Sequence, residues 1–218
     1  MTQNPFGQKP GQQNNQTHQN MQTGDVSAQM NHGAHELFDL HETLSETVAG
    51  LNQAILFRTK VKDPELLDIL NRQFQFTLNE YNITVEAFKT GRDPSQPTGK
   101  YQMKTGNDFV YGLKQSPPKK PIQSETEISD EIISGFLLGA AKAGATSKTM
   151  SALETANPVV RRVLADSVPN CIEMAYELSI YQNKHHYYQV PQLAQQDMQQ
   201  MLNSFATAET TIPNDKIQ

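Results

Sequence analysis

Residues 31–46, NHGAHELFDLHETLSE, gather an unusual density of side chains that can bind metals or transfer protons. The stretch contains three histidines and four carboxylates, namely His32, His35, His41, Glu36, Asp39, Glu42 and Glu46. Imidazole and carboxylate groups are common ligands of transition metals. Whether they form a metal site depends on whether these side chains converge on one point or are spread around a helix.

A pair of metals inside a four-helix bundle needs a specific ligand set. Two helices supply a glutamate each, and the other two supply a Glu-x-x-His motif whose spacing aims both side chains at one interior position. No glutamate of this chain is followed by a histidine three residues later. We therefore expect no di-metal centre.

A simpler site around His41 is the remaining metal hypothesis. His41 interrupts an apolar series on its helix, and in an antiparallel hairpin it would lie level with residues 81–85. The carboxylates that could approach it are Glu80, Glu42, Glu173 and Glu177. We favour a core histidine whose ring bonds a carboxylate or a tyrosine.

The other groups of this stretch are expected to face solvent. His32 and His35 lie at the fraying start of the helix, and the carboxylates at 39, 42 and 46 form a solvated acidic face. Glu36 and Asp39 also suit the helix N-terminus, where a negative charge is favourable. We predict no catalytic residue, no cofactor and no metal ligand in the chain, and thus no enzyme.

Three further candidates also have a structural interpretation. Cys171 occupies an apolar helix position, which predicts an inert, buried thiol, and as the single cysteine it cannot form an intramolecular disulfide. His185 and His186 are expected to end and dock a helix. Gly135 and Gly139 are expected to let a neighbouring helix approach closely, and no strand precedes them as a phosphate-binding loop would require.

Four long helices would position these side chains, at about 34–60, 64–90, 124–155 and 158–186. Asp63-Pro64 and Asn157-Pro158 are cap-plus-proline starts, and Ser124 with Glu127 forms a capping box. The short links after residues 60 and 155 predict two antiparallel helical hairpins. The apolar series of the first helix is Leu37, His41, Leu44, Val48, Leu51 and Ile55, and that of the third includes Ile132, Phe136, Gly139, Ala143, Met150 and Leu153.

Residues 91–123 contain too many prolines for a helix. They are either a flexible linker between two separate hairpins or a crossover that runs the length of one bundle. We favour the crossover, pinned by Tyr101, Phe109, Val110, Tyr111 and Leu113. The predicted fold is all-α, a ferritin-like four-helix bundle over residues 33–188, made of two hairpins joined by a long crossover.

Both ends of the chain differ from the predicted bundle. Residues 1–32 are rich in Gln and Asn without apolar periodicity, which predicts a disordered tail. Residues 189–218 contain an amphipathic helix at about 192–206, with Met198, Met201, Leu202 and Phe205 on one side. We expect this helix to fold back onto its own bundle, the alternative being that it is presented to a partner.

Composition narrows the function classes. The net charge of −5 argues against nucleic-acid binding, and Lys114, Lys119 and Lys120 are the only clustered cations. Neither a signal peptide nor a transmembrane stretch is found, so we expect synthesis in the cytoplasm without export by such a signal.

Several segments resemble the spore coat protein F family of endospore-forming bacteria. They are HGAHELFDLHETL, KDPELLDILNRQFQFTLNEYNITVEAF, NPVVRRVLADSVPNCIEMAYELSIYQNK and YYQVP, in order over residues 33–192. The resemblance implies a ferritin-like fold and residence in the spore, in the coat or the layer beneath it. The implied partners are other spore coat or envelope proteins, with self-association as a further expectation, and no reaction is implied.

The leading functional hypothesis is a structural spore protein. A ferritin-like metal oxidase or peroxide-protection protein with ligands around His41 is the competing class, and a helix-presenting adaptor is the third. Glutamine side chains of the tails and Lys119 or Lys120 could also be joined by isopeptide cross-links.

Overall fold

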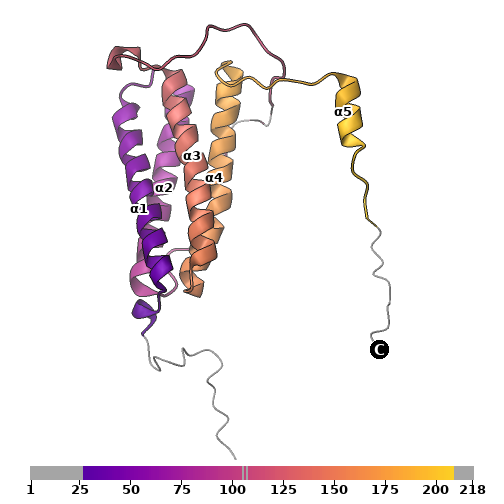
Figure 1. Ribbon diagram of the computed structural model, residues 1–218. Helices are drawn as coiled ribbons and strands as arrows, with labels where there is room; N and C mark the ends of the chain where they lie inside the picture. The colour runs from indigo at the N-terminus through magenta and orange to yellow at the C-terminus, as the bar shows by residue number, and fades with distance from the viewer. Residues whose placement is uncertain (1–26, 105, 107, 209–218) are drawn as a thin grey trace, which may run out of the picture.

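The computed structural model describes residues 27–104, 106 and 108–208, and this part of the chain is all-helical. Four long helices lie side by side: α1 (Ala34–Arg58), α2 (Pro64–Thr90), α3 (Asp130–Glu154) and α4 (Pro158–Lys184) (Figure 1). A short helix α5 (Gln195–Leu202) and two 3-10 turns, η1 (Ala28–Met30) and η2 (Glu125–Glu127), complete the elements. None of the described helices is long and apolar enough to cross a bilayer.

Two of the predicted helix starts are confirmed in atomic detail. The side chain of Asp63 accepts a hydrogen bond from the backbone N–H of Glu65 at 2.8 Å. Asn157 does the same at the start of α4, accepting from the N–H groups of Val159 and Val160. A proline follows each cap, where its missing N–H costs no helical hydrogen bond.

The turns at the two ends of the molecule set the direction of each helix. Asp130, at the start of α3, accepts hydrogen bonds from the N–H groups of Lys62 and Asp63 in the α1–α2 turn. At the other end, Glu36 of α1 accepts from Ala156 and Asn157 in the α3–α4 turn. Helices α1 and α4 therefore run in one direction and α2 and α3 in the other, and the chain must cross the full length of the helices between α2 and α3 (Figure 1).

Within the segment 91–123, residues 99–104 and 109–110 lie against α4, as expected for a crossover. Tyr101 is buried, and the ring of Phe109 lies 5.6 Å from that of Tyr176. The backbone of Val110 exchanges two hydrogen bonds with the Asn183 side chain, at 2.7 and 3.0 Å. The side chains at 111 and 113, which were also expected to pin the crossover, are exposed.

The apolar core is divided between the two ends of the helices. One cluster contains Leu40, Ile83, Ala87, Val160, Val163 and Leu164. The other contains Leu66, Ile69, Ile133, Leu138, Leu178 and Tyr181. Between them the buried side chains are largely polar, and we call this middle section, which holds Gln73, Glu80, Lys148, Asn170 and Glu177, the polar waist.

The predicted apolar series of α1 and α3 are wrong by about one position. On α1 the buried residues are Glu36, Leu40, Thr43 and Ala54, whereas Leu37, Val48 and Ile55 are exposed. On α3 the buried residues are Ile133, Ser134, Leu138, Lys148 and Ser151, and Phe136 and Met150 are exposed. The inward faces carry polar groups that find partners on other helices, so hydrophobicity alone selected the wrong face.

Several boundaries also differ from prediction. The capping-box sequence at 124–127 closes only the turn η2, and α3 begins at Asp130. Helix α5 is shorter than the expected 192–206. Of the expected N-terminal tail, residues 28–30 form η1 against α2. Residues 1–26 lie outside the described part of the chain.

Candidate functional site

His41, the focus of the metal hypothesis, lies on the outer surface of α1. Its side chain is exposed, while Glu80 and Glu177 are buried in the polar waist. The expectation of a core histidine is therefore wrong, because the inward face of α1 is the one that carries Leu40 and Thr43. The structure does not bring His41 together with these two carboxylates.

His32 and Glu36 form a buried pair, not the solvated start of a helix that was expected. Glu36 is fully buried, and its carboxylate accepts hydrogen bonds from His32 Nδ1 at 2.6 Å and from the Ala156 N–H at 2.9 Å. Further donors are the N–H groups of Gly33 and Asn157. This carboxylate ties the start of α1 to the α3–α4 turn, whereas Glu42 and Glu46 are exposed as predicted.

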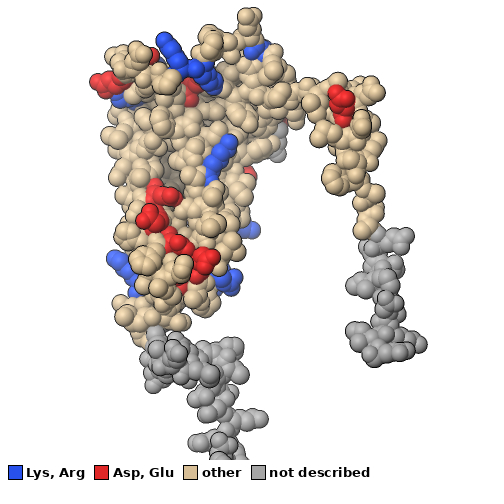
Figure 2. Space-filling model, in the orientation of Figure 1, with Lys and Arg blue, Asp and Glu red and all other residues tan. Residues whose placement is uncertain are grey.

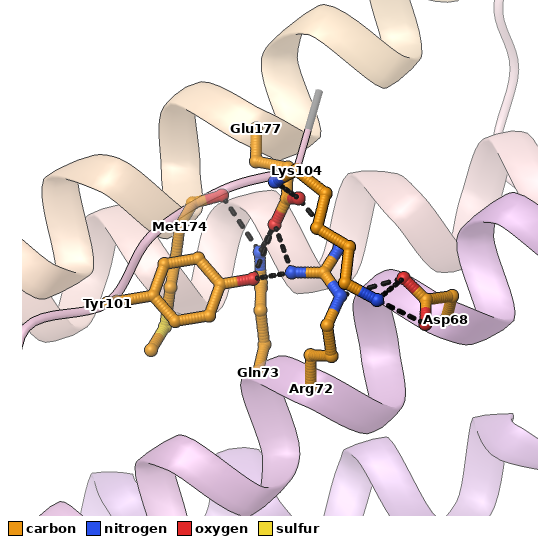
Figure 3. Close-up of polar contacts among 7 residues, drawn as sticks. All are labelled: Asp68, Arg72, Gln73, Tyr101, Lys104, Met174 and Glu177. Atoms are coloured by element: carbon orange, nitrogen blue, oxygen red, sulfur yellow. Dashed lines mark hydrogen bonds and ion pairs between the residues drawn. The ribbon is translucent and has the colours of Figure 1, made fainter. Parts of the chain in front are cut away.

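Glu177 of α4 is the centre of the largest polar cluster (Figure 3). The Arg72 guanidinium of α2 donates to it at 2.7 Å, and the Tyr101 hydroxyl of the crossover donates at 2.5 Å. Gln73 donates to the same carboxylate at 3.2 Å, and the Lys104 backbone N–H at 3.1 Å. One fully buried carboxylate thus joins two helices and the crossover.

The charges of this cluster are mutually compensated. Burial opposes ionisation of Glu177, but hydrogen bonds from Arg72 and Tyr101 outweigh it and hold the pKa of Glu177 below its ordinary value. Burial and the hydrogen bond to Glu177 raise the pKa of Tyr101, which keeps the phenol protonated as a donor. Arg72 also binds Asp68 at 2.7 Å, and Lys104 Nζ lies 3.2 Å from that carboxylate.

A second buried cluster lies around Glu80 of α2. Lys148 of α3 donates to one of its carboxylate oxygens at 2.9 Å and Asn170 of α4 to the other at 2.6 Å. Burial disfavours the ammonium of Lys148, yet the neighbouring Glu80 helps to keep the pKa of Lys148 above its ordinary value. Asn170 also fixes the crossover, accepting from the Tyr101 N–H and donating to the Gly99 carbonyl.

Cys171 lies beside this pair and is buried, as predicted. Burial raises the pKa of its thiol, which opposes the thiolate form needed for nucleophilic attack. The neighbouring ammonium of Lys148 acts in the other direction without reversing the shift.

The two histidines after α4 hold a helix end, as predicted. His185 caps α4, its ring stacks 5.5 Å from Tyr187, and its Nε2 lies 3.4 Å from the cap carboxylate of Asp63. His186 adopts φ 61° and its Nε2 lies 2.8 Å from Lys114 Nζ of the crossover.

The glycines of α3 behave differently from expectation. A Cβ added at Gly139 would meet nothing within 4 Å, so no helix approaches closely there. A Cβ at Gly135 would lie 3.5 Å from the Gln182 side chain, an ordinary contact.

These clusters consist of ion pairs and hydrogen bonds that link separate helices. Glu36, Glu80 and Glu177 each accept from at least two donors. Among the described residues no three His, Cys, Asp or Glu side chains are grouped to hold a metal ion. Sequence reasoning missed Arg72, Lys148 and Asn170, because their partners lie on other helices and no neighbouring residue in the sequence indicates them.

Comparison with known proteins agrees with the resemblance seen in the sequence. The model of the Coat F domain matches residues 129–191, which span α3, α4 and the segment after them. Over 181 residues the chain is 54% identical to the spore coat protein F-like protein YhcQ of Bacillus subtilis (strain 168), and the match covers 83% of each chain. No solved structure matches the chain. On the strength of that identity and coverage, the chain belongs to the spore coat protein F-like family.

Proposed function

We propose that this protein is a structural, non-catalytic component of the bacterial endospore, in the coat or the layer beneath it. The observation that carries the proposal is its 54% identity to a spore coat protein F-like protein. The buried ionisable groups support it, because each of them bonds to a residue of another part of the chain and so stabilises the fold. We further propose that residues 33–188 form one ferritin-like bundle, with other coat proteins as partners.

A fluorescent fusion expressed from the native promoter in a sporulating host tests this proposal. Fluorescence should form a ring around the forespore, and the protein should be recovered in the coat extract of mature spores. Fluorescence that stays in the mother-cell cytoplasm, with no protein in purified spores, would contradict it.

Metal analysis tests the competing oxidase hypothesis. Protein purified without chelators should contain less than one equivalent of iron or manganese, and His41→Ala should leave that content unchanged. A full equivalent of bound metal that supports peroxide or oxygen reduction would favour the enzyme.

Helix α5 supports a second role, as an adaptor that carries a partner-binding helix. The side chains of Met201, Leu202 and Phe205 are exposed, and α5 makes no contact with the other described helices (Figure 1). The expectation that α5 folds back onto the bundle is therefore wrong. Truncation after Pro191 should leave the melting temperature unchanged while reducing spore localisation, and a large loss of thermal stability would contradict the adaptor role.

Cross-linking within the coat is a further proposal. Lys120 and the glutamines of α5 are exposed, whereas Lys119 is held by Glu131 at 2.9 Å. Mass spectrometry of mature spores should detect Gln–Lys isopeptides at Lys120 in preference to Lys119. Quantitative recovery of the protein as an unlinked monomer would exclude such links.

A further inference from the structure

A cavity of about 370 Å³ lies at the level of the polar waist, and all four long helices line it. Small-molecule sites in proteins have volumes of roughly 300–1,000 Å³. Ordinary side-chain packing leaves few voids larger than a water molecule. The cavity therefore has the size of a small-molecule site.

The cavity opens to the surface between α1 and α3. Of its lining residues, those on α2 and α4 are buried or half-buried, and the exposed ones are Glu46, Ala49 and Ala143. Small side chains surround this mouth, because Gly50 lies on α1 and Ala140 and Gly144 on α3. Figure 2 shows the face on which α1 and α3 lie, with acidic side chains gathered over its lower half.

Two shallow grooves continue the mouth along the seam between these helices. One is lined by Gln53, Ile132 and Phe136 together with small residues of α3. The other runs past Thr43 and Glu46 to Met150. Both include Ala143, so this alanine lies where the grooves and the cavity meet.

The walls of the cavity are mainly apolar, with polar side chains from α1, α2 and α3 among them. The apolar lining is made by Leu51, Ala54, Leu70, Phe74, Leu137 and Met174. The polar lining includes the hydroxyls of Thr43 and Ser147, the thiol of Cys171 and the ammonium of Lys148. Mostly apolar walls with a few placed polar groups are the usual composition of a small-molecule site.

Lys148 supplies the most specific of these polar groups. An ammonium has three N–H donors. Among the described residues the Lys148 group meets a Glu80 oxygen at 2.9 Å and the Cys171 sulfur, so two partners share three donors in a side chain that lines the cavity. A ligand oxygen could accept a hydrogen bond from the third donor.

We propose that this cavity binds a small, neutral, mainly apolar molecule with one hydrogen-bond-accepting oxygen, such as an alcohol, ketone or ester. Its carbon chain would contact the apolar walls, and its oxygen would accept from Lys148. A carboxylate is disfavoured because Glu80 already neutralises Lys148, so a second anion would be buried without compensation. A protonated amine is disfavoured because an ammonium has no lone pair to accept from Lys148, and its charge would also be buried without compensation.

Displacement of a neutral fluorescent probe tests this assignment on the full chain. N-phenyl-1-naphthylamine should gain fluorescence on binding, and 1-octanol should displace it at concentrations about tenfold lower than octanoate or octylamine do, which corresponds to about 1.4 kcal/mol. Absence of probe binding, or equal displacement by octanoate, would overturn the proposal.

Two alanine variants locate the binding. Ala143→Phe places a ring at the mouth and should raise the 1-octanol concentration needed for displacement at least about tenfold. Ala165→Phe, at an exposed position of α4 outside the cavity lining, should leave it unchanged. Both alanines are exposed, so both variants should fold, and equal binding by the two would contradict the site.

A methyl NMR experiment separates the cavity from the other apolar surfaces. In protein labelled at the methionine methyl groups, 1-octanol should shift the resonance of Met174, which lines the cavity. The resonance of Met201 on α5 should not move. Shifts confined to Met201, or to Met150 in the outer groove, would show surface adsorption and overturn the proposal.

Discussion

Two interfaces between long helices, which we call the α2–α4 seam and the α1–α3 seam, are held together by different kinds of polar group. The α2–α4 seam is joined by Arg72 and Glu177 at 2.7 Å, and the crossover covers it through Tyr101. The α1–α3 seam is joined by hydroxyls, with Thr43 Oγ1 lying 2.7 Å from both Ser147 and Ser151, and nothing in the described chain covers it. Charged groups therefore secure the seam where the chain returns over the helices, and small neutral groups leave the other seam open.

Of the changes considered, removal of the Glu177 charge should destabilise the fold most. Glu177→Gln leaves the Arg72 guanidinium without its buried partner, which should lower the free energy of unfolding by about 3–5 kcal/mol. Urea denaturation at pH 7 measures the loss. Glu173→Gln, the same change one turn earlier at a half-exposed position, should cost less than about 1 kcal/mol. Similar losses in both variants would remove the special status of the α2–α4 seam.

Lowering the pH should reproduce part of the stability loss of Glu177→Gln in the wild-type protein. The pKa of Glu177 is lower in the folded chain than its ordinary value of 4.5, so its stabilisation is present above pH 4.5 and disappears as the pH falls through the folded pKa. The urea midpoint of the wild type should therefore fall more between pH 6 and pH 3 than that of Glu177→Gln. Parallel curves for the two proteins would show that Glu177 is not the group that titrates.

The hydrogen bond from Tyr101 of the crossover to Glu177 should contribute an intermediate amount to the free energy of unfolding. Tyr101→Phe removes a hydrogen bond to a buried carboxylate, which should cost about 1.5–3 kcal/mol. Tyr111→Phe alters an exposed ring of the same segment and should stay within about 0.5 kcal/mol of the wild type. If the two changes cost the same, the crossover does not secure the seam through Tyr101.

A mutation in the α1–α3 seam should lower the free energy of unfolding least. Thr43→Val keeps the shape of the side chain and removes the hydroxyl that meets Ser147 and Ser151, at a cost of about 1 kcal/mol. Thr149→Val, at an exposed position of α3, is the matched control and should cost less. A loss for Thr43→Val as large as that for Glu177→Gln would invert the comparison between the seams.

Local patterns in the sequence predicted the elements better than the faces they bury. Both cap-proline helix starts are found where expected, and Cys171 is buried, as its apolar helix position predicted. These features depend on neighbours a few positions away. The inward face of α1 could not be read in this way, because Thr43 is acceptable inside only where two serines of α3 meet it.

The polar waist was beyond prediction for the same reason. Glu177 and Glu80 were considered as metal ligands, yet the groups that they bind include Arg72 and Lys148, which lie 105 and 68 positions away in the chain. The type of a residue suggests what it can bind, but only the packed helices decide which partner reaches it. His41 is exposed for the same reason, because the packing of α1 against the other helices buries the face that carries Leu40 and Thr43.

The position of the polar waist between the helical hairpins has a consequence for how the chain folds. Each helical hairpin can form from contacts between nearby residues, whereas the waist joins positions such as Gln73 and Glu177 that are 104 residues apart. Contacts between distant positions carry a larger loop-closure entropy and form more slowly. We therefore expect assembly of the two hairpins, with the crossover closing over them, to limit the rate of folding.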